Sequence, residues 1–444
     1  MSKLINGFSK LSKIAKIDWL SKNYIQDNHF NQNIISESWY QNEPVQKVLE
    51  GFSENTISNF HLPFGLAPNF LINGNPYCIP MAIEESSVVA AASAAAKYWL
   101  DRGGFHAKVV DTQKVGQVHF YWYGHSEKLI HHFQEIKSKL IDSTTHLTTN
   151  MVNRGGGILN IELLNKTAEE PNYYQLFVTF ETCNSMGANF INTILESFAQ
   201  SLSDFIANSS HFNSDEKEVK IIMSILSNYT PDCLAKAWVE CNIEDLGSYN
   251  NMDANELAEK FYSAVKIAKL DPYRATTHNK GIFNGIDAVV IATGNDFRAV
   301  EACGHTYAAR NGKYSSLSNC SIENNIFRFE LEIPLAIGTV GGLTKLHPMA
   351  QLALQILGNP SAKTLMEIIA VVGLAQNFAA VRSLVTSGIQ KGHMKMHLGN
   401  ILQQLGSTEA EKAACTEYFH NKVISHSAVR DFLVSSRQEF DAKC

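Results

Sequence analysis

The 444-residue chain lacks several features that would assign it to a common class at once. Its eight cysteines are scattered and form no CxxC pair, which excludes a dense disulfide framework and the paired spacing of a zinc site, so reduced thiols are expected. No run of about 18 apolar residues occurs, so no transmembrane helix is expected. The first 20 residues contain neither a continuous apolar segment nor a small-residue cleavage site, unlike a secretory signal. These absences predict a soluble, cytoplasmic protein.

Charge and nucleotide-binding motifs are also sparse. Only 18% of the residues are charged, and the net charge is −6. Acidic and basic residues are interspersed along the chain, so no basic patch for nucleic acid or an anionic membrane is predicted. Neither a GxGxxG between a strand and a helix nor a GxxxxGK(S/T) is present, which argues against a Rossmann domain and a P-loop. The hydrophobic fraction of 45% is ample for a packed core, and the length suits two or three domains.

The middle of the sequence has the clearest hydrophobic periodicity. Alternation of apolar and polar residues predicts strands at 117–123, 159–163, 174–182 and 219–226. Apolar residues at steps of three and four predict one helix over 129–140 and another over 191–205. The resulting order, β-α-β-β-α-β, is the split βαβ or ferredoxin-like arrangement. We therefore expect a compact insert over residues 113–227.

The segments on both sides of the insert are expected to form one helix-rich α+β domain, residues 1–112 and 228–387. The N-terminal apolar spacing is typical of one or two amphipathic helices. Helical spacing recurs at 86–101, 254–268, 297–310, 349–357 and 362–385, and residues 326–333 alternate like a strand. Ser361 is the expected cap of the last helix. A more polar C-terminal segment, 388–444, begins with Gly388 and Gly392 as possible hinges.

Two stretches combine ionisable residues with small ones in ways that suggest chemistry. Glu84 and Glu85 precede the helix expected at 86–101, where acidic residues are common because of the helix dipole, although adjacent carboxylates can also hold a proton as a general acid. The segment 271–302 offers a second cluster. A lysine beside a carboxylate can stabilise an oxyanion, and an arginine can hold a substrate carboxylate, while caps and surface pairs are the structural alternative. The cluster comprises Arg274, His278, Asn279, Lys280, Asn284 and Asp296.

Two further stretches carry weaker signals. The sequence NSMGAN, residues 184–189, opens the second helix of the insert, where Asn184 can cap and exposed amides can bind a pyrophosphate. His393 and His397 are four residues apart, which would place both on one face of a helix. No HExxH surrounds them and no acidic third ligand accompanies them, so a proton donor on the tail is favoured over a metal site.

Taken together, these motifs resemble class II hydroxymethylglutaryl-coenzyme A reductase over roughly residues 50–400. EESSVVAAAS, at 84–93, is similar to the family's EEPSVVAAAS. DPYRATTHNKGIFNGIDAVVIATGNDFRAVEA, at 271–302, and VGLAQNFAAVRSLVTSGIQKGHM, at 372–394, are near-complete matches in the family's order. Four motifs in order are more specific than any one alone.

The resemblance implies a two-step, four-electron reduction of the thioester of 3-hydroxy-3-methylglutaryl-CoA to mevalonate and CoA, with NADPH or NADH and without a metal. The implied catalytic set is Glu85, Lys280, Asp296 and His393. Asp296 is expected to hydrogen-bond Lys280, and His393 to ride on a mobile C-terminal helical flap. Substrate contacts are implied for Ser87, Arg274 and Asn284. The large domain would bind substrate, the insert would bind the dinucleotide, and the active sites would lie between subunits of a homodimer or larger homo-oligomer.

The cofactor residues implied by the resemblance are Asn160, Asn184, Met186, Gly187 and Asn189. Asn184 replaces an aspartate of the family's DAMGAN, with loss of a charge near the dinucleotide. Asn160, at the position that helps to select the cofactor, is neutral and favours NADPH only slightly. Three alternatives stay open: a related acyl-CoA reductase, the same fold run oxidatively in mevalonate degradation, and a non-catalytic paralogue.

Overall fold

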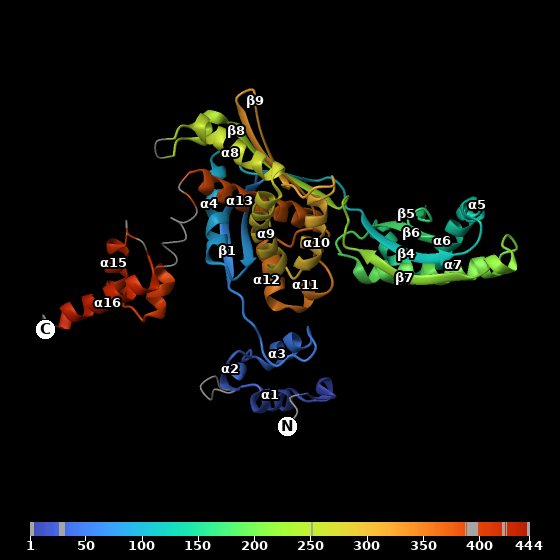
Figure 1. Cartoon of the computed structure of the whole chain (residues 1–444), viewed down its shortest axis with the longest axis horizontal. Helices are drawn as coiled ribbons and strands as arrows, with labels where there is room; N and C mark the ends of the chain where they lie inside the picture. Colours follow the sequence, from blue (N-terminus) through green and yellow to red (C-terminus); the bar gives the residue numbers. More distant parts are fainter. Residues whose placement is uncertain are drawn as a thin grey trace.

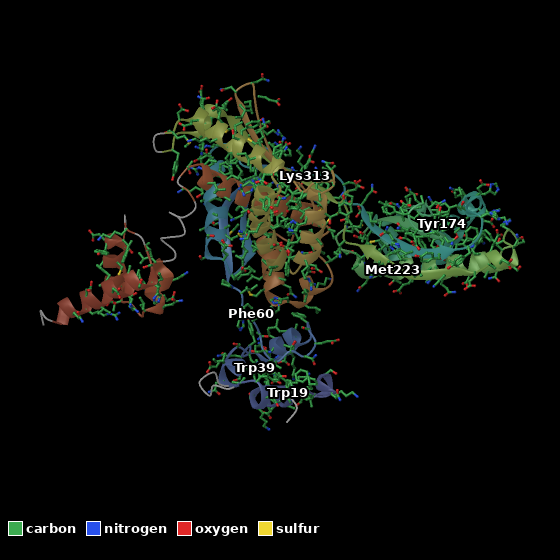
Figure 2. All side chains as sticks on the ribbon, in the orientation of Figure 1. Trp19, Trp39, Phe60, Tyr174, Met223 and Lys313 are labelled. Carbon is green, nitrogen blue, oxygen red and sulfur yellow. The ribbon has the colours of Figure 1, made fainter. Side chains whose placement is uncertain are left out.

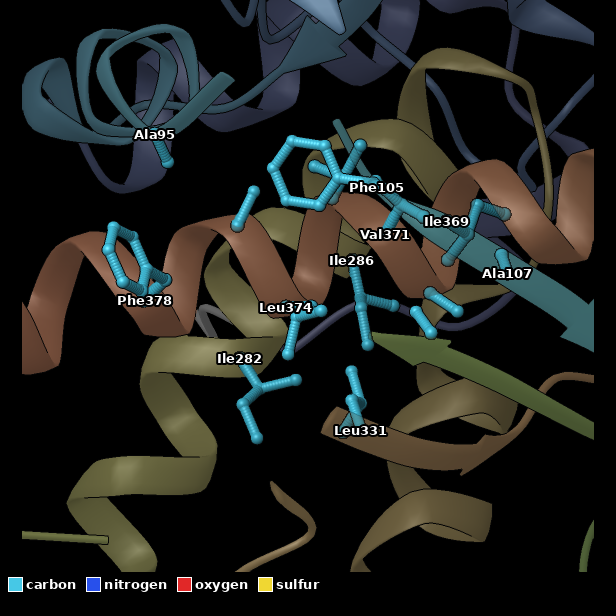
Figure 3. Packing of buried hydrophobic residues seen from close by; sticks show 14 of the residues in the cluster. Ala95, Phe105, Ala107, Ile282, Ile286, Leu331, Ile369, Val371, Leu374 and Phe378 are labelled. Carbon is cyan, nitrogen blue, oxygen red and sulfur yellow. The ribbon is translucent and has the colours of Figure 1, made fainter. Parts of the chain in front are cut away.

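The computed structural model describes residues 4–25, 32–249, 252–386, 388, 398–419, 422 and 424–441. The large domain is built around α13 (Ala362–Val385), a 24-residue helix that is buried on nearly every side. A helix that is apolar all round needs partners all round, and α4 (Ser86–Leu100), α9 (Pro272–Ala292) and a sheet provide them. Figure 3 shows side chains of α9 and of the strand region around residue 105 gathered against this helix.

That sheet has four antiparallel strands in the order β3-β8-β10-β9. They are β3 (His106–Val109), β8 (Leu234–Asn242), β10 (Ile326–Pro334) and β9 (Ser318–Glu323). Strand β3 directly precedes the insert in the chain and β8 directly follows it, and the two strands are paired, so both ends of the insert are fixed in the sheet. A hairpin of β1 (Phe64–Ile72) and β2 (Asn75–Ala82) packs against α4 and α9. Its two-residue turn, Asn73 and Gly74, has positive φ at both positions, as a type I′ turn requires.

Four more helices complete the large domain. They are α8 (Ala254–Leu270), α10 (Phe297–Ala308), α11 (Leu343–Leu346) and α12 (Pro348–Ile356), with η3 (Ile243–Leu246) before α8. By length and composition α13 is, among the described helices, the one that could cross a membrane, but 67% of its most apolar window is buried inside the protein. It is therefore read as the core helix of the large domain. The predicted cap is confirmed, because Ser361 Oγ accepts a hydrogen bond from Thr364 N at 3.1 Å.

The insert extends to one side of the large domain (Figure 1). Its elements are β4 (Lys114–Trp122), α5 (Ser126–His131), α6 (Phe133–Val152), β5 (Gly157–Asn165), β6 (Tyr173–Glu181), α7 (Ala188–Asn208), η2 (Ser214–Glu216) and β7 (Val219–Ser227). The four strands are antiparallel in the order β5-β6-β4-β7, which is a split βαβ arrangement. Residues of α6 and α7 bury against the sheet in a hydrophobic cluster of their own. The helix expected over 129–140 is in fact two helices, α5 and the longer α6.

Both ends of the chain form smaller helical units. The N-terminal elements are η1 (Phe8–Lys10), α1 (Lys13–Asn23), α2 (Gln32–Glu37) and α3 (Glu43–Glu50). Figure 2 places Phe60, 92% exposed, at the link between these helices and the large domain. At the C-terminus, α15 (Glu409–Tyr418) and α16 (His426–Asp441) share a small core with residues 398–402. All seven cysteines within the described residues are unpaired, as expected.

Candidate active site

A cavity of about 1250 Å³ lies between the segment 40–62, helix α9 and the α11–α12 region. Helix α9 lines it with residues spaced as one helical face, namely Lys280, Asn284, Asp287 and Ile291. Glu84 and Glu85, which lie between β2 and α4, line it from another side. The cavity therefore joins two of the motifs that the sequence singled out.

An ion pair joins the two motifs directly. Lys280 Nζ donates a hydrogen bond to Glu85 Oε2 at 3.1 Å. The other carboxylate oxygen of Glu85 accepts a hydrogen bond from Ser87 Oγ at 2.9 Å. Glu85 is the N-cap residue of α4, so the structural and the chemical interpretations of this glutamate both apply. The structure thus brings together four of the residues that the resemblance implied, namely Glu85, Ser87, Lys280 and Asn284.

The structure shows other partners for Asp296 than the Lys280 ammonium that the resemblance implied. Asp296 is the N-cap of α10 and accepts hydrogen bonds from the backbone N–H groups of Arg298 and Ala299. Its carboxylate also binds the guanidinium of Arg298 in two-pronged fashion, at 3.1 and 3.2 Å. Burial raises the pKa of Asp296, but these hydrogen bonds outweigh burial and hold it below its usual range. The Asp296 carboxylate therefore binds the first amides of α10 and the Arg298 guanidinium instead of the Lys280 ammonium.

One predicted residue, Arg274, does not line the cavity. Arg274 lies in the first turn of α9, six residues before Lys280, and is half-buried but absent from the cavity wall. Within the described residues it has no ion-pair partner. His393 and Gly392 lie outside the described residues. Within the described residues, the predicted substrate clamp Arg274 is thus separate from the cavity that contains Lys280 and Glu85.

Sequence reasoning missed an acidic pair on the cavity wall. Asp287 of α9 and Glu301 of α10 both line the cavity. Burial raises the pKa of Asp287 to about 8, and the neighbouring carboxyl of Glu301 acts in the same direction. The Asp287–Glu301 pair therefore retains a proton more readily than two separate carboxylates would. Steps of four and three residues from Lys280 to Asn284 to Asp287 are the sequence signal that places Asp287 on the same helical face as Lys280.

The NSMGAN segment forms a tight turn into α7. Gly187 has a φ of 92°, and a Cβ there would come within 2.4 Å of Thr182 Cγ2, so the position requires glycine. No side chain caps the first amides of α7, which begins at Ala188 and includes Asn189 in its first turn. A Cβ on Gly338 would lie 2.5 Å from Met186 N, which shows how closely the loop around Gly338 packs on this turn. These uncapped amides are the feature that fits a pyrophosphate.

Asn184 was expected to cap α7, but it does not. Its Oδ1 accepts a hydrogen bond from Ala362 N at 2.9 Å, at the start of α13, and its backbone oxygen accepts one from Thr339 N. The reason is that Gly187, and not Asn184, stands immediately before α7. Asn184 therefore ties the cofactor motif to the large domain. A carboxamide oxygen can make this bond without the negative charge of an aspartate.

Asn160 lies on β5 between two charged side chains. Its Oδ1 accepts a hydrogen bond from Lys137 Nζ at 2.7 Å, and its Nδ2 donates one to Glu162 Oε1 at 2.7 Å. Lys137 belongs to α6 and was not singled out from the sequence. It brings a positive charge to the position that was predicted to select the cofactor.

An ammonium–carboxylate pair lies on the wall of a large cavity, and an uncapped helix N-terminus lies on a separate α/β insert, an arrangement that suits an enzyme. The sequence model of the hydroxymethylglutaryl-coenzyme A reductase family matches residues 15–398. The chain therefore belongs to this family of oxidoreductases.

Individual relatives agree with that assignment. The 3-hydroxy-3-methylglutaryl-coenzyme A reductase of Archaeoglobus fulgidus is 36% identical over 419 residues, which are 93% of this chain and 89% of that protein. The class II reductase of Streptococcus pneumoniae, solved bound to NADPH in open conformations, has a TM-score of 0.70 at 36% identity and covers 86% of this chain and 99% of that one. Another structure of the Streptococcus pneumoniae enzyme covers 97% of this chain and 99% of that one, with a TM-score of 0.71 at 35% identity.

Proposed function

We propose that this chain reduces 3-hydroxy-3-methylglutaryl-CoA to mevalonate and free CoA in two steps, with NADPH as the preferred hydride donor. The observation that carries the proposal is the 3.1 Å contact between Lys280 Nζ and Glu85 Oε2 on the wall of the cavity. Family membership identifies the substrate. The contact places a cation, Lys280, next to a group that can carry a proton, Glu85.

The residues of this chain stabilise the substrate's carbonyl oxygen and transfer protons, while bound nicotinamide would supply one hydride in each step. Overall the thioester takes up two hydrides and two protons and yields an alcohol and a thiol. Lys280 is assigned to hydrogen-bond the carbonyl oxygen as negative charge develops on it. Glu85 is assigned to deliver the proton that converts the alkoxide of the second step into the alcohol. Ser87 holds Glu85 Oε1, which leaves Oε2 directed at Lys280.

Three further roles complete the proposal. Asn284, one turn after Lys280 on the cavity wall, is assigned to the acyl end of the substrate. Asp296 is assigned a positioning role at the start of α10, next to Asn295, whose Oδ1 accepts a hydrogen bond from Gly338 N at 2.8 Å. His393 is assigned to protonate the departing CoA thiolate from a C-terminal flap beginning near residue 388, which would stop the thiolate from adding back.

The insert is assigned to the dinucleotide. The uncapped amides of α7 suit a pyrophosphate, with Met186, Gly187 and Asn189 around the turn. The hydrogen bond from Lys137 to Asn160 supports NADPH over NADH, because an ammonium there attracts the additional phosphate. Glu162 opposes this preference, so we expect NADPH to be favoured but NADH to be used as well.

We also infer that the active enzyme is at least a homodimer, with Arg274 serving a site that a second subunit completes. This is supported by the position of Arg274 outside the cavity of its own chain and by the 62% exposure of Lys280. Sedimentation of the purified chain at several concentrations, with activity measured in parallel, tests the inference. A monomer with full activity would contradict it.

The decisive experiment for the function follows nicotinamide absorbance with 3-hydroxy-3-methylglutaryl-CoA and NADPH or NADH at equal concentrations. Oxidation of two nicotinamides per mevalonate formed would support the proposal and give the cofactor preference. Folded protein that oxidises neither cofactor would overturn it and favour a non-catalytic paralogue. Mevalonate and CoA with the oxidised cofactor form a second assay, because a catalyst accelerates both directions.

A further inference from the structure

We propose that His132, Glu135 and His211 form a binding site for a divalent transition-metal ion, Zn²⁺ above all, at the outer end of the insert. The three side chains come from two segments far apart in the sequence. His132 stands immediately before α6 and Glu135 lies in its first turn, whereas His211 follows the end of α7. Two histidines and one carboxylate are a ligand set that Zn²⁺ takes, with water in a fourth position. The inference does not depend on the proposed function.

The distances place all three ligands around one point. Glu135 Oε2 lies 3.2 Å from His211 Nε2 and 4.0 Å from His132 Nδ1. One ligand atom from each residue can be chosen so that all three lie within 4.8 Å of one another. Ligand atoms of a tetrahedral zinc ion are about 3.3 Å apart, given bonds of about 2.0–2.2 Å. Closing the site therefore requires ligand atoms to move by up to about 1.5 Å, and the two rings to rotate out of their stack so that both nitrogen lone pairs, which lie in the ring planes, point at one ion.

The stacking of the two imidazoles is the feature that an ordinary ion pair does not explain. The rings of His132 and His211 are parallel within 14°, with centroids 3.8 Å apart. The stack brings two imidazoles together beside one carboxylate, and a neutral imidazole offers a nitrogen lone pair to a metal. A glutamate in the first turn of a helix is favoured by the dipole alone, but the dipole does not bring two histidines to it.

The surroundings leave the site accessible to an ion. The side chains of His132, Glu135 and His211 are 21%, 50% and 38% exposed. The nearby ammonium of Lys128 is held by Glu216 at 2.6 Å, so Glu135 does not have to neutralise it. In Figure 1 helix α5, which ends beside His132, lies toward the end of the insert that faces away from the large domain. A metal there would join the start of α6 to the segment after α7 and would stiffen the insert without touching the Lys280 cavity.

The experiment is a calorimetric titration of the full chain with ZnCl₂ after removal of metal by a chelator. Wild type is compared with His211→Gln, Glu135→Gln and His146→Gln. His146 is an exposed histidine of the same helix α6, so its variant is the matched control. Zinc ligands elsewhere in the chain, such as His393, bind alike in all four proteins. We expect one Zn²⁺ to bind about tenfold or more weakly in the two ligand variants and unchanged in the control.

Thermal unfolding gives a second readout. Zn²⁺ should raise the melting temperature of wild type and of His146→Gln, and this increase should be smaller in the two ligand variants. Circular dichroism and nicotinamide turnover without added zinc show whether each variant keeps its fold. Glu135→Gln is the safer variant, since glutamine still hydrogen-bonds a neutral histidine but is a poor zinc ligand. Equal zinc isotherms for wild type and a folded Glu135→Gln protein, or no zinc binding by wild type, would overturn the proposal.

Discussion

Lys280 Nζ and Glu85 Oε2 are 3.1 Å apart although 195 residues separate them in the sequence. Lys280 lies in the middle of α9, and Glu85 is the residue immediately before α4. Both helices pack against α13, so the geometry of the pair is set by the core of the large domain. The two motifs that resembled the family's are thereby joined by a contact in this structure.

Replacing Lys280 by alanine should lower turnover about 100-fold or more, because the developing oxyanion loses its cationic partner. The side chain is 62% exposed, so the melting temperature should change little. Nicotinamide oxidation at saturating substrate measures the effect. Lys97→Ala, an exposed lysine of α4, is the control and should keep wild-type turnover. A folded Lys280→Ala protein with most of its activity would refute the assigned role.

Asp296→Asn separates helix capping from charge. Asparagine caps helices about as well as aspartate, so α10 and the melting temperature should be preserved. If the negative charge of Asp296 helps to position the site, kcat should fall about tenfold or more while KM for the acyl-CoA changes little. Arg298→Ala removes the arginine that pairs with Asp296 and serves as the companion variant. An Asp296→Asn enzyme with unchanged kcat would limit this residue to its capping role.

Lys137→Ala should weaken the preference for NADPH. The ammonium that bonds Asn160 Oδ1 would be lost, so KM for NADPH should rise while KM for NADH stays nearly constant. Lys139→Ala, two residues further along α6 and exposed, is the matched control. The measurement is the ratio of kcat/KM for the two cofactors. The same ratio in wild type and Lys137→Ala would exclude Lys137 as the selecting cation.

His278 should make the fold sensitive to acid. Burial lowers the pKa of His278 to about 3, and the positive charge of Arg274 adds to the lowering. In the unfolded chain a histidine takes up a proton below about pH 6.5, so below that pH the unfolded state binds more protons than the folded state. The free energy of unfolding should therefore fall as the pH drops from about 6.5 toward 3, with no contribution from His278 above that range.

The variant His278→Gln tests this, with denaturant unfolding at pH 7.5 and pH 5. It should be less stable than wild type at pH 7.5, since the hydrogen bond between His278 Nε2 and Ser318 Oγ at 2.6 Å is altered. Its loss of stability between the two pH values should nevertheless be smaller. His146→Gln should retain the wild-type loss. Equal losses in all three proteins would show that His278 does not cause the acid sensitivity.

Asp287 should have the opposite pH dependence. With its pKa raised to about 8, the folded state keeps a proton that the unfolded state releases above about pH 4. Its contribution to the free energy of unfolding should fall as the pH rises from about 4 to 8. Asp287→Asn should therefore raise the melting temperature at pH 8 by about 2 °C or more and change it less at pH 5. Identical shifts at the two pH values would contradict the raised pKa.

Periodic segments were predictable from the sequence, and contacts between segments were not. The strands and second helix of the insert, the helix of residues 362–385 and its Ser361 cap follow from spacing of apolar residues and from cap chemistry. Helix α9 is not predicted, because Gly281, Gly285 and the polar residues of its motif weaken its apolar period. The partners of Asp296 and Asn184 could not be predicted, because each depends on which backbone amides the tertiary fold brings nearby. That Glu85 and Lys280 belong to one site is implied by the motif resemblance and not by periodicity, and their direct contact is seen only in the structure.

The exposure of the Lys280–Glu85 pair determines how strongly its charges act. With 62% and 35% of the two side chains in contact with solvent, the attraction between them is screened by water and by salt. At a separation near 4 Å, opposite unit charges interact by about 1 kcal/mol in bulk water and by about 4 kcal/mol at the effective dielectric constant near a protein surface. The same two residues thus become a stronger acid–cation unit once substrate, dinucleotide or a neighbouring subunit displaces the water. The electrostatic effect of Lys280 and Glu85 on a bound substrate therefore depends on how completely water is excluded around them as much as on their own geometry.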